Sequence, residues 1–489
     1  MPHSRRDFLT TTAGAATATL AGTLGFSAPD TRPPNLLFVL ADQWRASALG
    51  IGSDKVVRTP NVDRLASQGA HWQRAYAANP VCTPNRSCIL TGRFSHQHGM
   101  IANDLMLPPS EVCWPEIYRD AGYATHYIGK WHMDGTDKPG YVPKGWRRRG
   151  FDTFEGFNRG HVYHKEYGFD DDGGPLFAKW NADGRPYYEP SLQTDLAIDF
   201  MRRKQDRPFC CYLSWGPPHT PLNPPDAWDK YGPGDIQLRP NVPAMHRQQA
   251  RKDLSGYYGL CESLDFEMGR LLEFLDDSGL ADNTLIVFTA DHGELAGSHG
   301  KYRKGEPEEE SLNVPLIMRL PGRIKSGLQT QTLCNSIDLM PTLLTLCGLK
   351  SPDTCTGHDV SNAVTVDGTP PDVESIYTEG KVNAGDDGED EPPRRNRRRA
   401  APPSAWRTLV TPRHKLTVRG DFEHVEQLID LHNDPFEQDN LAGNPEHRSL
   451  QDDLLAELRR WAKQTGDVFP KIPTAARVMY TDAEADTAR

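Results

Sequence analysis

The sequence predicts an α/β fold: a large, mostly parallel or mixed sheet sandwiched by helices, with a smaller α+β subdomain at the C-terminal end. Two observations support this prediction. Short apolar runs rich in β-forming residues suit strands that are buried on both faces, and helical patterns lie between them. Each run is also followed almost at once by polar residues, as expected where strands open into a binding crevice. The runs are residues 35–40, 123–128, 209–214 and 284–289.

The N-terminal residues 1–28 are typical of an export signal rather than of a folded element. Arg5 and Arg6 form a twin-arginine start, an apolar Ala/Thr/Leu/Gly stretch follows, and small residues stand at positions 27 and 28. We therefore expect passage through the Tat translocase, cleavage, and a periplasmic or secreted mature protein; a chance basic N-terminus is the alternative. No later stretch reaches the roughly 18 to 20 unbroken apolar residues of a membrane helix, so no stable membrane insertion is expected.

The composition argues against some partners. The chain of 489 residues is 37% hydrophobic and 25% charged, which is compatible with a sizeable core. Its formal charge of −11 argues against nucleic acid as the main partner, because phosphate binding needs a basic face. The nine cysteines are scattered and odd in number, unlike the disulfide framework of a small secreted domain. One cysteine is therefore a candidate for a different role.

The catalytic α/β domain is expected to span residues 33–382. Within it, residues 254–277 show a helical pattern that ends at Gly279, and an apolar helix is predicted over 337–349. Residues 383–404 have almost nothing to bury and predict a flexible charged insertion or linker. Its arginines either bind an anionic polymer or form a solvated charge run balanced by the acidic stretch before them.

A small C-terminal subdomain is expected over residues 405–489. Alternating apolar and polar residues predict strands at 406–410, 415–418 and 426–430. The amphipathic pattern over 447–465 then predicts a helix.

Cys82 is the cysteine with the most informative surroundings. It precedes Thr83 and Pro84, which resemble an N-cap and the first residue of a helix, and Gly92 is a plausible C-terminal stop. Cys82 would then lie at the mouth of a short helix, where free amides and the helix dipole favour anions. A cysteine phosphatase needs five residues between Cys and Arg, but three separate Cys82 from Arg86. A buried structural cysteine is the alternative interpretation.

At this point the sequence resembles a known family. The pattern C-T-P-N-R, followed by L-T-G-R, is similar to the signature of type I sulfatases, which belong to the alkaline phosphatase superfamily. The neighbouring motifs agree with those of this family over nearly the whole expected mature chain. They are Ala41-Asp42-Gln43, Gly129-Lys130-Trp131-His132, Pro218-His219-Thr220-Pro221, Asp291-His292-Gly293, Lys304 with its following glutamates, and residues 428–441.

The resemblance implies that Cys82 is converted to formylglycine (3-oxoalanine) by the formylglycine-generating enzyme. It also implies one calcium ion, because Asp42, Gln43 and Asp291 offer oxygen ligands of the kind that calcium prefers. His292 is the expected fourth contributor, and the hydrate of residue 82 completes the set. One hydroxyl of that hydrate attacks sulfur with Asp291 as the proton acceptor, so no water attacks the sulfur.

The remaining catalytic roles follow from the same resemblance. His219, helped by Lys304, protonates the leaving oxygen, and His132 then takes a proton from the second hydroxyl to expel sulfate. Arg86 is expected to hydrogen-bond the hydrate. Lys130 and Lys304 supply positive charge to the sulfate oxygens, as an oxyanion hole does.

The family pattern is not matched everywhere, and alternatives stay open. Glu308 and Asn313 stand where the family commonly has Tyr and Arg, and Gln43 lowers the negative charge of the metal site by one unit. A phosphonate monoester or phosphodiester hydrolase of the same superfamily is the nearest alternative, although the pair Lys130 and His132 favours a sulfatase. A catalytically inactive glycan-binding protein is a second alternative. The organic half of the substrate is read by loops such as residues 158–180, and a carbohydrate sulfate is preferred over an aryl sulfate.

Overall fold

The structure is a computed structural model that describes residues 32–180, 186–203, 206–380, 405–469 and 478–488. The expected signal peptide over 1–28 and the expected linker over 383–404 lie outside these residues. The described residues belong to one compact unit.

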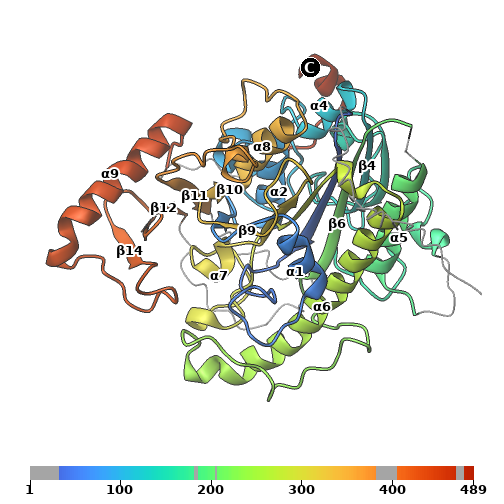
Figure 1. The fold of residues 1–489 in the computed structure, drawn as a ribbon. Coiled ribbons are helices and arrows are strands. Elements are labelled where there is room, and N and C mark those ends of the chain that lie inside the picture. Colours follow the sequence, from blue (N-terminus) through green and yellow to red (C-terminus); the bar gives the residue numbers. More distant parts are fainter. Residues whose placement is uncertain (1–31, 181–185, 204–205, 381–404, 470–477, 489) are drawn as a thin grey trace, which may run out of the picture. The chain divides into compact units, whose positions relative to one another are not determined.

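A sheet that includes β4 and β6 forms the centre of the fold (Figure 1). It has eight strands in the order β5-β4-β6-β1-β7-β8-β2-β9. Its pairings are parallel except those of β8 with β7 and β2, so the sheet is mixed but mostly parallel. The four predicted runs form the adjacent strands β4, β6, β1 and β7. The strand bounds are β1 Asn35–Asp42, β2 Ala70–Trp72, β4 Ala124–Lys130, β5 Thr153–Phe157, β6 Phe209–Pro218, β7 Thr284–Ala290, β8 Leu316–Arg319 and β9 Leu328–Thr330.

Helices cover this sheet in two groups. One group, α1, α5 and α6, packs together and against β6 and β8, while α2, α4 and α8 form the other (Figure 1). Every residue of β1, β4, β6 and β7 is buried, which requires cover on both faces and explains why their sequences are continuous apolar runs. The helices are α1 Pro60–Ser67, α2 Cys82–Thr91, α3 Ser95–His98, α4 Trp114–Asp120, α5 Glu189–Arg203, α6 Arg247–Asp277, α7 Glu309–Leu312 and α8 Leu339–Leu346.

Two of these helices differ in length from the prediction. Helix α6 begins seven positions before residue 254, because its first turns carry polar residues such as Arg247 and Gln249 that hide the apolar period. Helix α8 is shorter than residues 337–349, since a short 3-10 turn over Ser336–Asp338 precedes it and Gly348 follows its end.

A second, four-stranded antiparallel sheet lies at the C-terminal end of the chain and contains β11 Ile376–Gly380, β12 Trp406–Val410, β13 His414–Arg419 and β14 Val425–Asp430. Helix α9 (Arg448–Thr465) packs on β12 and β13, and α10 (Asp482–Ala488) follows it. The predicted strands and helix are present here. β11 was not predicted, because its five residues show no clear alternation; it precedes the expected linker yet pairs with β12. A two-stranded sheet joins β3 (Ala75–Tyr76) to β10 (Cys334–Asn335).

The carboxyl ends of the four adjacent strands meet at one edge of the large sheet. There, the pairing of β1 with β6 shifts register between Ala41 and Asp42, which turns the end of β1 away from the regular pleat. Gln43 and His132, which follow β1 and β4, adopt the left-handed backbone conformation that non-glycine residues rarely take. Such strain clusters at functional sites. No helix among the described residues combines the length and apolar character needed to cross a membrane.

Candidate active site

Cys82 is the first residue of α2, at the edge where the strands end. The helix is preceded by Val81 rather than by Thr83, so the predicted N-cap was wrong. The physical reason is that the Thr83 hydroxyl donates a hydrogen bond to the carbonyl of His132 at 2.7 Å instead of capping the helix. The predicted stop is confirmed, because Gly92 is the left-handed C-cap. Cys82 is therefore held at a helix mouth, as expected.

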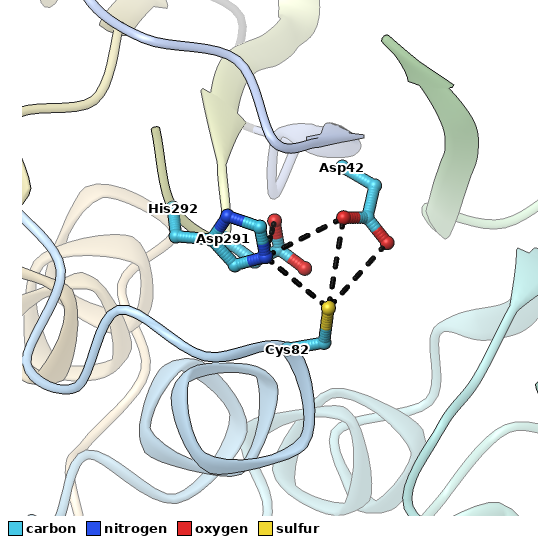
Figure 2. A group of neighbouring side chains, drawn as sticks. All are labelled: Asp42, Cys82, Asp291 and His292. Atoms are coloured by element: carbon cyan, nitrogen blue, oxygen red, sulfur yellow. Dashed lines mark hydrogen bonds and ion pairs between the residues drawn. The ribbon is translucent and has the colours of Figure 1, made fainter. Parts of the chain in front are cut away.

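Three buried side chains, those of Asp42, Asp291 and His292, converge around the Cys82 thiol (Figure 2). One ligand atom from each of Asp42, Cys82, Asp291 and His292 lies within 4.8 Å of the others. His292 Nε2 is 3.2 Å from Cys82 Sγ and 3.5 Å from an oxygen of each aspartate. His292 Nδ1 is 3.1 Å from the Gly293 carbonyl, which fixes the proton on Nδ1 and leaves Nε2 free to bind a cation.

Gln43 contributes an amide beside this cluster. Its Nε2 donates to Glu294 at 2.6 Å, and its Oε1 is buried without a hydrogen-bond partner among the described residues. A buried carbonyl oxygen of this kind is normally satisfied. Two carboxylates and an imidazole nitrogen within 4.8 Å of one another fit a divalent cation such as calcium, and the unpartnered amide oxygen of the neighbouring Gln43 is a further candidate ligand.

Three cationic side chains surround the same thiol. Arg86 reaches Asp291 at 2.9 Å and Asp42 at 3.1 Å, and Lys130 Nζ lies 2.7 Å from Asp42. Lys304 Nζ lies 2.8 Å from Cys82 Sγ. These three cations exceed the two carboxylates by one positive charge, which a bound cation would increase. This group of side chains is therefore suited to an anion such as a sulfate ester.

Burial and these charges shift the acidities of the site. Burial raises the pKa of Cys82 to about 11, and Asp42 adds to the effect. The thiol consequently stays protonated at neutral pH, in agreement with the sequence argument against a thiolate mechanism. Burial alone would raise the pKa of Asp42, but the charges of Lys130 and Arg86 hold it well below its ordinary value.

The two histidines predicted to transfer protons, His132 and His219, also lie at the edge of the sheet where the strands end. His132 Nε2 is 3.2 Å from Asp104, and Asp104 in turn pairs with Arg159 at 2.7 Å. His219 Nδ1 is 2.8 Å from the Thr220 carbonyl, so its proton is on Nδ1 and Nε2 is the nitrogen left for exchange. Burial lowers the pKa of both His132 and His219 well below the ordinary value.

Comparison with known proteins places the chain in a family. The family model described as "Sulfatase" matches residues 34–349, which is most of the described part of the large domain. The chain belongs to the sulfatase family. It is therefore a hydrolase of sulfate esters, as the sequence predicted.

Named relatives of this sulfatase support the assignment over most of its length. An "ulvan-active sulfatase" from Formosa agariphila is 34% identical over 89% of this chain and 82% of its own. An "N-acetylglucosamine-6-O-sulfatase" from Bacteroides thetaiotaomicron is 25% identical over 90% of this chain and 88% of its own. Among solved structures, a putative sulfatase from Bacteroides fragilis has a TM-score of 0.79 and 28% identity, covering 92% of this chain and all of that one.

The structure adds residues to this sulfatase site that sequence reasoning missed. His161 stacks on His219 with ring centroids 3.6 Å apart, and its Nε2 is 3.0 Å from Lys130 Nζ. His161 lies in the loop over residues 158–180 that is predicted to read the organic half of the substrate, but the sequence predicts no individual role for it, and none for Asp104. Both residues lie in loops without a strand or helix pattern. Only residues that directly follow a predicted strand could be placed at the edge of the sheet from the sequence.

Proposed function

We propose that this sulfatase hydrolyses carbohydrate sulfate esters, with residue 82 in its formylglycine form and with one calcium ion. The supporting observation is the convergence of Asp42, Asp291 and His292 with three cations around the side chain of Cys82. Here Sγ marks the position from which the hydrated aldehyde would face the substrate. A thiol with a raised pKa is a poor nucleophile in that position, whereas a hydroxyl of the hydrate is a suitable one.

The proposed calcium ligands are Asp42, Gln43, Asp291 and His292 together with residue 82. When bound, the ion would supply positive charge that polarises the sulfate oxygens. Arg86 contacts both aspartates and also donates to the Lys130 carbonyl at 2.8 Å. Arg86 therefore fixes the two aspartates relative to the end of β4.

The chain's own side chains bind the sulfate group and move the protons. Lys130 and Lys304 bind the sulfate oxygens, which gain charge as the ester bond breaks. His219 donates the Nε2 proton to the leaving oxygen from its doubly protonated form, in which the Thr220 carbonyl keeps the Nδ1 proton and the negative charge of the bound sulfate group favours the second proton. His132, oriented by Asp104, removes a proton at residue 82 when sulfate is released.

A sugar is the proposed organic half of the substrate. The names of the relatives support this choice, since one names N-acetylglucosamine and another ulvan. His161 and Tyr163, in the loop expected to face the sugar, lie close to the catalytic His219. The loop therefore reaches the position at which the leaving group would stand.

The activity test uses protein purified from a host that carries a formylglycine-generating enzyme. It compares a panel of sulfated saccharides with an aryl sulfate and an aryl phosphonate monoester. We expect the highest kcat/KM on a saccharide sulfate; faster turnover of the phosphonate ester would favour the alternative hydrolase. An aldehyde-reactive hydrazide should label residue 82, and mass spectrometry showing only a thiol there in active enzyme would contradict the proposed nucleophile.

We also infer Tat-dependent export from Arg5 and Arg6. Fractionation of the native host should place the mature protein outside the cytoplasm. Replacement of both arginines by lysine should retain the precursor inside, and unchanged export would contradict this inference.

A further inference from the structure

Glu294 lies beside the candidate metal site and takes no part in the chemistry described above. Its carboxylate is buried and accepts three N–H groups: Gln43 Nε2 at 2.6 Å, the Ala296 amide at 2.7 Å and the Arg303 amide at 2.8 Å. An ionised carboxylate only accepts hydrogen bonds, so these donors match it. Glu294 thus connects the residue after β1 with the loop after β7.

Gln43 has three of its four polar groups fixed by the protein. Its backbone N–H donates to Asp291 at 3.1 Å, its carbonyl accepts from Tyr257 at 2.8 Å, and its Nε2 donates to Glu294. Its Oε1 is the remaining group, buried and unpartnered among the described residues. Because Glu294 accepts from the NH₂ end of the amide, it determines that the oxygen end is the one left for a cation.

The same carboxylate holds the loop that leads to Lys304. Arg303 and Ala296, whose amides it binds, both have positive φ angles, of 69° and 44°. A backbone hydrogen bond from Leu295 to Arg303, at 2.8 Å, closes the loop around it. The next residue, Lys304, reaches Cys82 Sγ. Strained backbone persists only where neighbouring groups fix it, and here Glu294 is one of those groups.

We propose that Glu294 is a positioning residue that turns the Gln43 amide oxygen toward the metal site and fixes the loop that presents Lys304. This inference rests on the proposed calcium-dependent function. The isosteric substitution E294Q tests it, because its amide oxygen can still accept from Ala296 and Arg303 while its NH₂ group would face the NH₂ of Gln43. To avoid two opposed donors, Gln43 must rotate and offer an N–H, rather than an oxygen, to the cation.

The measurement is calcium affinity by titration calorimetry on chelator-treated protein, which needs no turnover. We expect E294Q to bind calcium 10- to 100-fold more weakly than the wild type, the range usual for residues that orient metal ligands. The loss should disappear in a Q43A background, since Glu294 acts on the metal through Gln43. E116Q is the matched control: Glu116 also accepts a backbone N–H, from Cys113, but lies in α4, and its substitution should leave calcium affinity unchanged.

Two outcomes overturn the inference: equal calcium affinity in folded E294Q and wild type, or the same loss in the Q43A background, which would indicate a general structural effect. Should E294Q fail to fold, E294D replaces it. Its shorter side chain keeps the charge but cannot reach both Gln43 and the loop, so the same loss is expected, and unaltered affinity contradicts the proposal. A failure of the proposed function can be distinguished from a failure of this inference. In the first case, the wild type itself would lack calcium binding or sulfatase activity.

Discussion

At the scale of single residues, Lys130 shows how one side chain connects the parts of the site. Its ammonium group lies 2.7 Å from Asp42, 3.0 Å from His161 and 3.7 Å from Cys82 Sγ. It is fully buried, so these groups replace the water that would otherwise solvate its charge. In the proposed mechanism, a buried cation held in this way is preorganised for a sulfate oxygen.

Lys130→Ala should therefore lower kcat at least a hundredfold, equivalent to a loss of about 3 kcal/mol of transition-state stabilisation. Steady-state kinetics on the best sulfated substrate measures this. Lys144→Ala is the control, because Lys144 is more than half exposed and pairs with Asp171 and Asp172 away from the site. Unaltered turnover in the Lys130 variant would remove this lysine from the catalytic set.

At the scale of elements, the glycine of the G-K-W-H motif has a structural explanation. Gly129 lies in β4 at φ 100°, and a Cβ there would stand 2.1 Å from the Ser214 carbonyl oxygen of β6. The two residues are paired in the parallel ladder. Glycine is thus required for β4 to approach β6, and this approach sets the position of Lys130 one residue later.

Gly129→Ala should destabilise the protein by more than the roughly 1–2 kcal/mol that a left-handed backbone alone costs an alanine. Gly122→Ala separates the cost of the positive φ angle from the cost of the contact with Ser214. Gly122 also has a positive φ, of 90°, but a Cβ there meets nothing within 4 Å. Urea denaturation of both variants measures the difference. Equal losses would show that the contact with Ser214 is unimportant.

The helices and strands differ in how far their own residues predict them. β1, β4, β6 and β7 were predictable because strands buried on both faces need continuous apolar runs. The N-cap of α2 was not, because the Thr83 hydroxyl bonds to His132, 49 positions away. β11 escaped prediction since a short strand derives its stability from its partner β12, which comes after the expected linker.

At the scale of the whole molecule, the C-terminal sheet supports the loop that carries Lys304. Trp406 Nε1 in β12 donates to the Gly305 carbonyl at 3.0 Å, and Lys415 in β13 donates to the Pro307 carbonyl at 2.7 Å. Both acceptors closely follow Lys304 in the chain. The small sheet is therefore connected, through backbone carbonyls, to the loop that carries Lys304 into the candidate active site.

Trp406→Phe should keep most of the buried ring but lose the hydrogen bond to Gly305. A buried carbonyl left unsatisfied costs about 1–3 kcal/mol, and the freed loop should present Lys304 less precisely. We expect kcat to fall while calcium affinity stays unchanged. Trp461→Phe is the control, because Trp461 donates to Ser375 instead; an equal fall in kcat in both variants would contradict the role of Trp406.

His96 connects helix α3 to the C-terminal sheet and gives stability a pH dependence. Burial alone would lower its pKa, but Glu379, at 3.1 Å, and Asp467 raise it above the ordinary value of 6.5. The pKa of His96 is higher in the folded state than in the unfolded state. The stabilisation that protonated His96 gives to the folded protein is therefore complete below about pH 6.5 and is lost as the pH rises through the folded-state pKa. The melting temperature should therefore fall between pH 5.5 and 8.5, and His96→Gln should make this fall smaller. An equal dependence of melting temperature on pH in the variant and the wild type would contradict the role of His96.

The sequence by itself determined the family, the α/β class and most of the proposed site residues, because chemically specific side chains follow strands whose apolar runs are unmistakable. Tertiary structure decided how these residues act together: the orientation of the Gln43 amide by Glu294, the pairing of His132 with Asp104, and the stacking of His161 on His219. These contacts join loops far apart in the chain. Loops have no periodic pattern, and a hydrogen bond between two of them depends on the packed geometry of the elements that bring them together.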